Sequence, residues 1–538
     1  MTVERSPKQS VSPTSGFFEG AGFATLYVLP IANAFFKPWH VNAYHHAYPV
    51  GSIPRAIFFL TLLVWALASL AISVADRASA RKSALIWSAL TVALVWLLGR
   101  IVAGILNAHP VAAARVLVAT HITMATTVVA LLVLRIMRPA LLGQIFNAAR
   151  AFSTVSAFGM LILLPKLGLQ AFQKEAAEQT AFTNPSLAMP APGQPRIVWI
   201  LLDELSYNVV FQHRPPGLTF PNLERFAQHS TSFSNLQPAG YYTELVIPSL
   251  ILGQPVADVE HIYGRPFRYR TVDRGPWYPY DPQRTIFGEA RRLGWTTGIA
   301  GWFNPYCRIL PGVLDRCFWR DSDAYPMFQG PLYYERSTFR NLLALLRPQE
   351  RMDPFAALPV DRVTRIHDYL KILPQAENLL RDPRIRFVML HLPIPHPPGI
   401  YDRSRQSLGP TGNYIDNLVL ADRTVGELMR VIQSTPGASE TSVIVSSDHS
   451  WRVNYWKTIS DWTSEEQQVS GGRFDPRPVL MVQLAGQDAS RTIEQPTNAM
   501  VVHRILQGLL RNQIHSDDDL DRIAGSAPLQ NTTAERRP

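Results

Sequence analysis

The sequence has few charged residues and only two cysteines. Charged residues make up 17% of its 538 positions, below the roughly 25% of an average soluble domain. The formal net charge is +10, yet no basic stripe interleaved with aromatics and no nucleic-acid motif is present. Nucleic acid is therefore excluded as a partner. The shortage of charge reflects apolar runs, which fill most of the first 170 residues.

The two cysteines, Cys307 and Cys317, lie close together in the segment CRILPGVLDRC. If this segment lies outside the cytoplasm, a local disulfide is expected. Closing so short a loop stabilises a fold by about 2–3 kcal/mol in the chain-entropy model. A pair of unlinked thiols is the alternative.

Four apolar segments are long enough to cross a membrane as helices, which takes about 20 mainly apolar residues. They are residues 56–74, 84–106, 116–134 and 151–169. An earlier segment, 17–36, contains Glu19 and Pro30 and either spans the membrane or lies in its interface. No small-residue cleavage site follows it, so it is not interpreted as a removed signal peptide.

Basic residues between these segments predict their orientation, because Lys and Arg favour cytoplasmic loops. The loops after the first span and before the last span carry Arg77, Arg81 and Lys82, and Arg135, Arg138 and Arg150. The chain beyond residue 169 then lies outside the cytoplasm. This predicts a multi-pass protein of a bacterial-type inner (cytoplasmic) membrane, with its C-terminal domain on the periplasmic, extracytoplasmic side.

A reporter fused after Gln194 tests this topology. An enzyme that needs export for activity should be active there, because both basic loops place this point outside. Activity of a reporter that works only in the cytoplasm would overturn the orientation and, with it, the environment that favours the disulfide.

Composition divides the chain into four parts. Residues 1–175 form a transmembrane anchor, 176–195 a Pro-rich linker, 196–515 an extracytoplasmic α/β domain, and 516–538 a polar tail that is expected to be disordered. In the α/β domain, apolar strand-like runs such as RIVWILLDE, RFVMLHLPIPH and TSVIVSSDH alternate with helical stretches. This alternation predicts a mainly parallel sheet covered by helices on both faces.

Residues suited to metal binding and catalysis follow several of these strands. They are Asp203, Glu204, Thr243, His396, Asp448 and His449. Ligands bind beyond the carboxyl ends of parallel strands, so these side chains are expected to converge. Carboxylates and imidazole suit Zn²⁺ or Mn²⁺, and a hydroxyl coordinated to such a metal becomes a nucleophile near neutral pH. Taken singly, each residue has a simpler explanation as a helix cap, a surface residue or part of a turn.

The order of these motifs resembles the sulfatase and alkaline-phosphatase superfamily. A strand ending in Asp203 is followed by FPNLERFAQHSTSFSNLQP, a loop ending PSLILG, then HPP, ADRTVGEL and VIVSSDH. The resemblance covers residues 196–487. With the apolar spans in front, the whole chain is similar to lipoteichoic acid synthases and lipid A phosphoethanolamine transferases.

The resemblance implies a role for each motif residue. Asp203 matches the acidic metal ligand after the first strand, and Asp448 and His449 match the paired ligands of the Asp-His motif. Thr243, five residues before a proline, matches the metal-coordinated nucleophile. His396 matches the histidine that lies near the transferred group or a second metal.

The sequence also departs from the family pattern. A sulfatase needs a C/S-x-P-x-R motif, which TELVIP lacks, so sulfate-ester hydrolysis is not expected. Ser450 replaces the usual Gly after Asp-His, and no histidine precedes the last strand in GGRFDPRPVLMV. These departures favour one tightly bound divalent metal, Zn or Mn, over two. Glu204 is a further possible ligand, although such transferases usually need one acid at this point.

Three functions follow from the resemblance. In the first, a phospholipid donates its phosphoethanolamine or phosphoglycerol headgroup to Thr243, which passes it to a glycan or lipid acceptor. In the second, water resolves the phospho-threonine and the protein is a phosphoric-ester hydrolase. In the third, the domain binds lipid without catalysis. The presence of Asp203, Thr243, Asp448 and His449 favours an enzyme.

Overall fold

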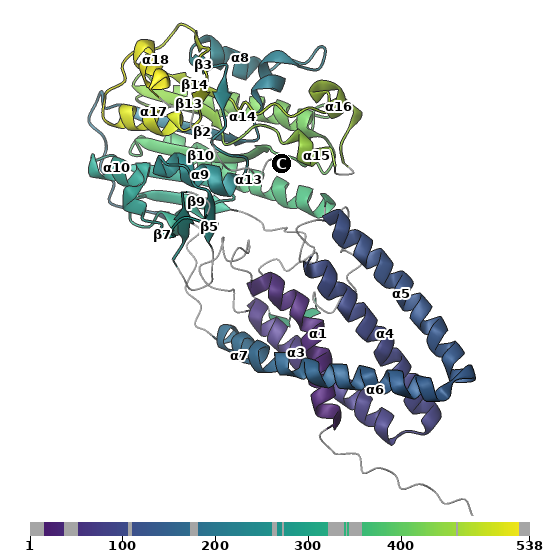
Figure 1. Ribbon diagram of the computed structural model, residues 1–538. Helices are drawn as coiled ribbons and strands as arrows, with labels where there is room; N and C mark the ends of the chain where they lie inside the picture. The colour runs from purple at the N-terminus through teal and green to yellow at the C-terminus, as the bar shows by residue number, and fades with distance from the viewer. Residues whose placement is uncertain are drawn as a thin grey trace, which may run out of the picture. The chain divides into compact units, whose positions relative to one another are not determined.

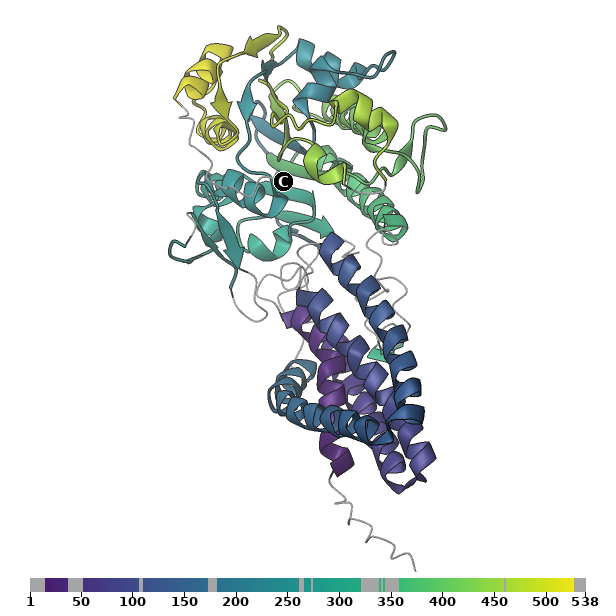
Figure 2. The ribbon, with the colours of Figure 1, turned by 45° about the vertical axis from the view of Figure 1, so that its right-hand side comes forward.

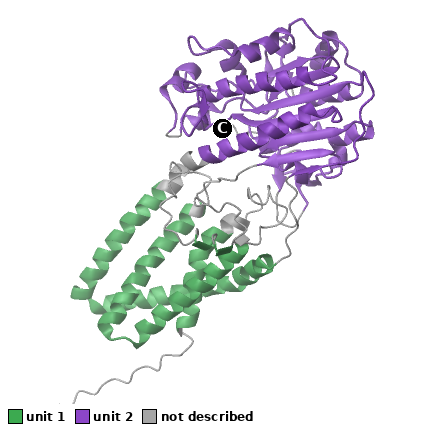
Figure 3. Ribbon diagram, turned by 180° about the vertical axis from the view of Figure 1, so that it is seen from behind, with its two compact units in different colours: residues 1–42, 48–176, 325–356 green, residues 43–47, 177–324, 357–538 purple. Residues whose placement is uncertain are grey.

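The computed structural model describes residues 15–36, 52–105, 110–172, 181–260, 266–271, 274–320, 338–339, 342–343, 358–458 and 461–526. The chain divides into two compact units (Figure 3). The described residues up to 172 belong to the first unit, and those in 181–320 and 358–526 belong to the second.

The first unit is a helical bundle. Its helices are α1 (Ser15–Phe36), α3 (Ser52–Arg77), α4 (Ala80–Ile105), α5 (Pro110–Met137), α6 (Pro139–Ser156) and α7 (Met160–Ala171), with a short 3₁₀ turn (Ala157–Gly159) between the last two. Four stretches are long and apolar enough to cross a membrane: Pro54–Arg77, Ala80–Ala103, Arg115–Met137 and Pro139–Ala171. The prediction of four apolar helices of spanning length is therefore confirmed.

Arg150 does not lie in a loop before the last span, and this corrects the sequence interpretation. It lies inside α6, where its Nε is 3.0 Å from Glu19 Oε1 and its guanidinium also pairs with Asp76. The guanidinium lies 4.7 Å from the centre of the Trp87 ring. Two carboxylates and an aromatic face accommodate this charge within the bundle, so only Arg135 and Arg138 remain near the turn between α5 and α6.

Small residues on α1 allow its neighbours to approach closely. A Cβ at Gly20 would lie 2.1 Å from Ser69 Oγ of α3, and a Cβ at Gly22 would lie 1.6 Å from the Ser153 carbonyl oxygen of α6. Helices in membranes associate through such small residues, because lipid tails supply no hydrophobic drive to bring them together. The sequence allowed segment 17–36 either to span the membrane or to lie in its interface. In the structure it is a packed helix of the bundle.

The second unit is built on a nine-stranded sheet with strand order β1-β9-β8-β10-β2-β13-β14-β3-β15 (Figure 1). The strands are β1 (Ala181–Thr183), β2 (Arg196–Asp203), β3 (Thr231–Phe233), β8 (Thr297–Trp302), β9 (Arg316–Arg320), β10 (Phe387–Pro395), β13 (Thr441–Ser447), β14 (Leu480–Gln483) and β15 (Arg491–Ile493). The five strands β9, β8, β10, β2 and β13 are mutually parallel. The predicted α/β fold with a mainly parallel sheet is confirmed.

Helices cover both faces of this sheet (Figures 1 and 2). One face packs against α9 (Thr243–Leu252), α10 (Ile286–Arg292) and α17 (Val501–Leu510). The other packs against α8 (Pro221–Gln228), α13 (Leu358–Arg381) and α14 (Tyr414–Ser434). Every residue of β2, β10 and β13 is buried, as expected for central strands covered on both sides.

Smaller elements complete this unit. They are η3 (Asn208–Gln212), β4 (Leu236–Gln237), β5 (Asp258–Glu260), β6 (Arg268–Arg270), β7 (Tyr278–Pro279), η4 (Pro282–Arg284), α11 (Tyr306–Ile309), β11 (Tyr401–Asp402), β12 (Ser407–Leu408), α15 (Val453–Trp456), α16 (Ser464–Ser470), β16 (Thr497–Asn498) and α18 (Asp517–Gly525).

Two domain boundaries drawn from composition need correction. The predicted linker, 176–195, contains β1, which pairs antiparallel with β9 at the edge of the sheet. The predicted disordered tail, 516–538, begins with the helix α18, whose Leu520 and Ala524 are buried. A capping box at Ser516 and Asp519 starts that helix. Residues 527–538 lie outside the described residues.

The predicted disulfide is present between Cys307 in α11 and Cys317 in β9, ten residues apart. Thiol labelling under denaturing, non-reducing conditions should therefore find neither cysteine free. Cys317→Ser should lower the free energy of unfolding by about 2–3 kcal/mol, because the unfolded chain regains the freedom of that loop. Full labelling of both cysteines in the oxidised protein would contradict the disulfide.

Candidate active site

Strand alternation brings polar side chains from three adjacent strands to one face of the sheet. Along β2, the side chains of Trp199 and Leu201 point to the face of the sheet that α9 covers. Side chains alternate along a strand, so Asp203, two residues after Leu201, points to the same face. The same period places His391 of β10 and Asp448, just after β13, on that side. These three side chains are completely buried at the carboxyl edge of the parallel strands.

Thr243 reaches this point because α9 begins with it. Val246, Ile247 and Leu250 are fully buried and fix the helix against the sheet, while Thr243 forms its first turn. The N-terminus of α9 and the positive end of its dipole therefore lie at Thr243, where they favour a negatively charged group.

The Thr243 hydroxyl lies between two carboxylates and an imidazole. It donates to Asp448 Oδ2 at 2.9 Å and to Asp203 Oδ2 at 3.3 Å, and it lies 3.5 Å from His449 Nε2. His449 Nε2 is 3.2 Å from Asp448 Oδ2. The structure thus brings together four of the residues that the sequence predicted for this centre.

Backbone groups fix the Asp-His pair. The backbone N–H groups of Glu204 and His449 donate to Asp448 Oδ1, at 3.1 and 2.7 Å. His449 Nδ1 lies 3.1 Å from the Ser450 carbonyl oxygen, which can only accept, so Nδ1 carries the proton and the Nε2 lone pair faces Thr243. Both Asp448 Oδ2 and His449 Nε2 therefore remain available as ligands.

Burial sets the ionisation of the site. Desolvation, followed by the charges of Asp448 and Glu204, raises the pKa of Asp203 well above its usual range, and desolvation also raises the pKa of Asp448. Burial lowers the pKa of His449 to about 3 and that of His391 to about 4, so both imidazoles are neutral near pH 7. Crowded carboxylates beside neutral imidazoles are suited to a bound cation.

The donor atoms fit a divalent metal. Ligand atoms of Asp203, Asp448 and His449 all lie within 4.8 Å of one another. Atoms about 2.1 Å from a tetrahedral zinc ion are about 3.4 Å apart, close to the 2.9–3.5 Å separations around Thr243 Oγ1. Asp203 Oδ1 and His391 Nε2 are buried without a hydrogen-bond partner within the described part of the chain. Such unsatisfied buried atoms are costly unless a ligand completes them.

Glu204 and His396 take part in a second cluster beside this centre. Glu204 accepts from Arg452 Nε at 2.6 Å and from Trp456 Nε1 at 2.8 Å. His396 Nε2 lies 3.1 Å from Arg452 Nη2 and 3.6 Å from Glu204 Oε1. Asp203, Glu204 and His396 could also group around a metal, but the Arg452 guanidinium already neutralises the Glu204 carboxylate.

The backbone of Glu204 is strained where it turns out of β2. Its φ is +63°, a left-handed conformation that costs a residue with a side chain about 1–2 kcal/mol. This turn carries the Glu204 carboxylate away from Thr243 and toward Arg452. The strain therefore separates two consecutive acids into two different clusters.

Sequence reasoning missed His391 and Arg452. His391 Nε2 lies 3.7 Å from Asp203 Oδ2, and its Nδ1 lies 2.8 Å from the Tyr306 hydroxyl. One signal existed, because His391 is the polar residue in the otherwise apolar series Phe387, Met389, His391 on one face of β10. No local pattern distinguished Arg452 from other basic residues, since its partner is 248 residues away.

A threonine hydroxyl held between carboxylates and an imidazole at the carboxyl edge of such a sheet is a site with the side chains of a metal-dependent enzyme. A family model agrees with this class: the chain belongs to the sulfatase family, whose model (Sulfatase) matches residues 195–472. Members of the wider alkaline phosphatase superfamily are metal-dependent enzymes. No curated protein matches the chain by sequence.

Several solved structures are similar to part of this chain. The phosphonate monoester hydrolase of Agrobacterium radiobacter is 12% identical, with 59% of this chain and 74% of that chain covered and a TM-score of 0.34. An alkaline phosphatase superfamily protein from Vibrio parahaemolyticus is 16% identical, with 63% and 71% covered and a TM-score of 0.34. The PsFucS1 sulfatase from Pseudoalteromonas sp. is 16% identical, with 59% and 68% covered and a TM-score of 0.37.

Proposed function

We propose that this protein is a membrane-anchored phosphotransferase that moves a phospholipid headgroup through Thr243. The observation that carries the proposal is the Thr243 hydroxyl, held 2.9 Å from Asp448 Oδ2 and 3.3 Å from Asp203 Oδ2 at the start of α9. A threonine cannot become formylglycine, so the sulfate-ester chemistry of the family's name does not suit this site. Four helices of spanning length on the same chain support a lipid donor.

The reaction proceeds in two displacements at phosphorus. In the first, Thr243 Oγ1 bonds to the headgroup phosphorus, the bond from phosphorus to the glycerol oxygen breaks, and that oxygen takes up the threonine proton. Diacylglycerol leaves, and the headgroup phosphate, phosphoethanolamine or phosphoglycerol, stays on Thr243. In the second, a hydroxyl of a glycan or lipid acceptor attacks the same phosphorus, loses its proton and restores the threonine hydroxyl.

The residues around Thr243 divide this work. Asp203, Asp448 and His449, with His391 beside them, would hold one divalent metal, Zn²⁺ or Mn²⁺, which lowers the proton affinity of the threonine hydroxyl and offsets charge on phosphorus. The N-terminus of α9 favours the phosphoryl oxygens. Arg452, whose guanidinium lies 6.0 Å from the centre of the Tyr242 ring next to Thr243, offers guanidinium N–H groups to the same oxygens, while Glu204 balances its charge.

Labelled phospholipids test the proposal directly. The purified full-length protein is incubated with phosphatidylethanolamine or phosphatidylglycerol labelled in the headgroup, and its intact mass is measured. We expect a mass increase equal to one headgroup phosphate on Thr243 and equimolar release of diacylglycerol. Addition of an acceptor should then move the label to it.

Two other results are informative. Release of free headgroup phosphate, with or without acceptor, would show that water resolves the phospho-threonine and that the protein is a hydrolase. A protein that contains metal but gives neither adduct nor release with any phospholipid would contradict both enzymatic proposals and favour a lipid-binding role.

Arg452→Lys should lower turnover about 10²-fold, because lysine keeps the charge but not the paired N–H geometry of the guanidinium. Bound metal should stay unchanged, since Arg452 is not a ligand. Lysine still neutralises Glu204, so the variant should fold, whereas Arg452→Ala would leave a buried carboxylate unpaired at a cost of about 3–5 kcal/mol. Wild-type turnover by Arg452→Lys would contradict a role for the guanidinium at phosphorus.

A further inference from the structure

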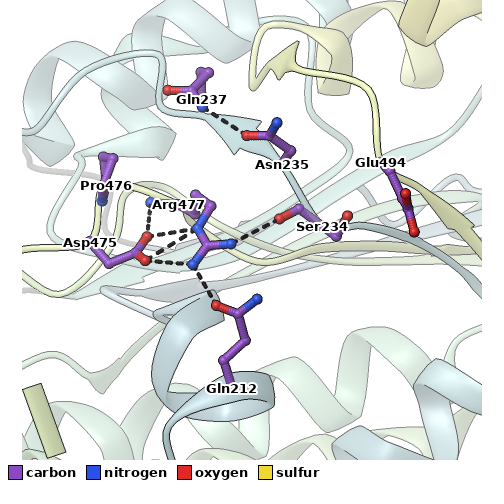
Figure 4. A pocket seen from close by; sticks show the side chains of 8 residues that line it. All are labelled: Gln212, Ser234, Asn235, Gln237, Asp475, Pro476, Arg477 and Glu494. Atoms are coloured by element: carbon purple, nitrogen blue, oxygen red, sulfur yellow. Dashed lines mark hydrogen bonds and ion pairs between the residues drawn. The ribbon is translucent and has the colours of Figure 1, made fainter.

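A polar pocket lies at the same edge of the sheet as the candidate active site and is lined by none of the residues that the proposed chemistry uses. Its volume is about 540 Å³, and it is lined by Gln212, Ser234, Asn235, Gln237, Asp475, Pro476, Arg477 and Glu494 (Figure 4). All but one of these side chains carry a hydrogen-bonding group. The lining of the pocket is therefore mainly, though not entirely, polar.

The fold places this pocket at the catalytic edge of the sheet. Arg477 lies three residues before Leu480, the first residue of the antiparallel strand β14, and Leu480 pairs with Ser446 near the end of β13. Ser234 follows the end of β3, which pairs with the same strand. The carbonyl oxygen of Arg477 accepts the backbone N–H of Tyr207 at 3.0 Å. Tyr207 is four residues beyond Asp203, so the Cα atoms of these two residues are at most about 14 Å apart. Arg477, which lines the pocket, is therefore hydrogen-bonded to the chain close to Asp203.

An aromatic contact joins the pocket to the nucleophile loop. Phe474, directly before the pocket residue Asp475, packs its ring 5.6 Å from that of Tyr241. Tyr241 lies two residues before Thr243. The segment that carries the pocket residue Asp475 is thus packed against the loop that leads to Thr243.

The centre of the pocket is rigid. The Arg477 guanidinium donates to Asp475 Oδ2 and Gln212 Oε1, both at 2.6 Å, and to the Ser234 carbonyl oxygen at 3.4 Å (Figure 4). It also lies 5.2 Å from the centre of the Tyr207 ring. These contacts hold three walls of the pocket in one arrangement.

Other polar groups of the lining remain unused within the described part of the chain. The amide nitrogens of Gln212 and Asn235 have no hydrogen-bond acceptor, and the Glu494 carboxylate has no donor or ion pair. Amide donors beside a carboxylate acceptor match the paired hydroxyls of a sugar, each of which both donates and accepts. Asp475 and Glu494 outweigh Arg477 in charge, so the pocket disfavours a phosphate or another anion.

We infer that this pocket binds a neutral or amino sugar of a glycan acceptor, whose hydroxyl then attacks the phosphoryl group on Thr243. The role of the sugar as acceptor rests on the proposed transferase function. Binding of a sugar to the pocket does not depend on turnover. The Glu494 carboxylate favours an amino sugar over a neutral one, because a protonated amine would form an ion pair with it.

Sugar binding is measured on the full-length protein in a detergent without a sugar headgroup. The probes are maltose, as a neutral disaccharide, and the disaccharide of glucosamine. Saturation-transfer NMR and a concentration series should give dissociation constants on the order of 1 mM, as expected for small fragments with few contacts. The glucosamine disaccharide should bind more tightly than maltose.

Substitutions locate the binding. Gln212→Ala combined with Asn235→Ala should weaken both probes by about tenfold, the loss expected for one or two good hydrogen bonds. Glu494→Gln should weaken the glucosamine disaccharide more than maltose. Gln513→Ala, an exposed glutamine outside the pocket, is the matched control and should change nothing.

Thr243→Ala separates this inference from the proposed function, because it removes the nucleophile and leaves the pocket intact. It should bind both probes like the wild type even when no transfer occurs. Failure of phospholipid turnover alongside pocket-dependent sugar binding would contradict the transferase and leave the sugar site standing. Absence of binding to either probe, or binding that the pocket substitutions do not weaken, would overturn the inference.

Discussion

Thr243→Ala should reduce headgroup transfer by at least about 10³-fold, because within the described residues no other hydroxyl lies between Asp203, Asp448 and His449. The substitution removes a hydroxyl but no charge, so bound metal should remain close to that of the wild type. Turnover is measured by release of labelled diacylglycerol, and metal content by elemental analysis of the same sample.

Thr243→Ser is the matched control, because it keeps the hydroxyl and should retain measurable transfer. The simpler explanation of Thr243 is that it only supports the start of α9, and its loss would then cost about 1 kcal/mol of stability and little activity. Near wild-type turnover by Thr243→Ala would establish that explanation and end the proposed mechanism.

Asp448→Asn should strip the metal from a domain that still folds. Asp448 Oδ1 accepts two backbone N–H groups, and an asparagine oxygen can keep those contacts. The charge of Oδ2 is lost, however, and loss of a direct ligand should weaken metal binding by more than the 10–100-fold typical of an outer partner. Metal stoichiometry and activity should fall together.

Glu204→Gln is the comparison variant for the metal. The structure places the Glu204 carboxylate on Arg452 and Trp456, so its neutralisation should leave the metal stoichiometry unchanged. Loss of metal in Glu204→Gln would make Glu204 a ligand after all. Unchanged metal in Asp448→Asn would instead show that the Asp-His pair is structural.

Much of the architecture could be predicted from local pattern. The apolar run before Asp203 is uninterrupted, and the segment before Asp448 and His449 has the apolar centre VIV; such runs become central parallel strands. Once those strands are parallel, the polar residues at their ends meet at one edge. Hydrophobic runs of spanning length likewise predict the helices of the first unit without any tertiary information.

The remaining features depend on contacts between distant segments. Arg150 has the appearance of a loop residue in the sequence, but in the structure it is a half-buried helix residue that forms ion pairs with Glu19 and Asp76 from two other helices. Two consecutive acids, Asp203 and Glu204, appear equivalent until the positive φ of the second turns it toward Arg452. Short elements such as β1 and α18 contain too few residues for a hydrophobic periodicity to be recognised. By composition they cannot be distinguished from a linker or a polar tail.

The pairing of Glu204 with Arg452 has a consequence for how the protein responds to its metal supply. Arg452 is part of the polypeptide, and it occupies the Glu204 carboxylate that a second ion would otherwise need. If only one ion must be captured from solution, activity should rise with free metal concentration along a single hyperbola, with a Hill coefficient of one. An organism short of Zn²⁺ or Mn²⁺ would then lose this activity in direct proportion to occupancy, whereas a site that needs two ions would fail more abruptly.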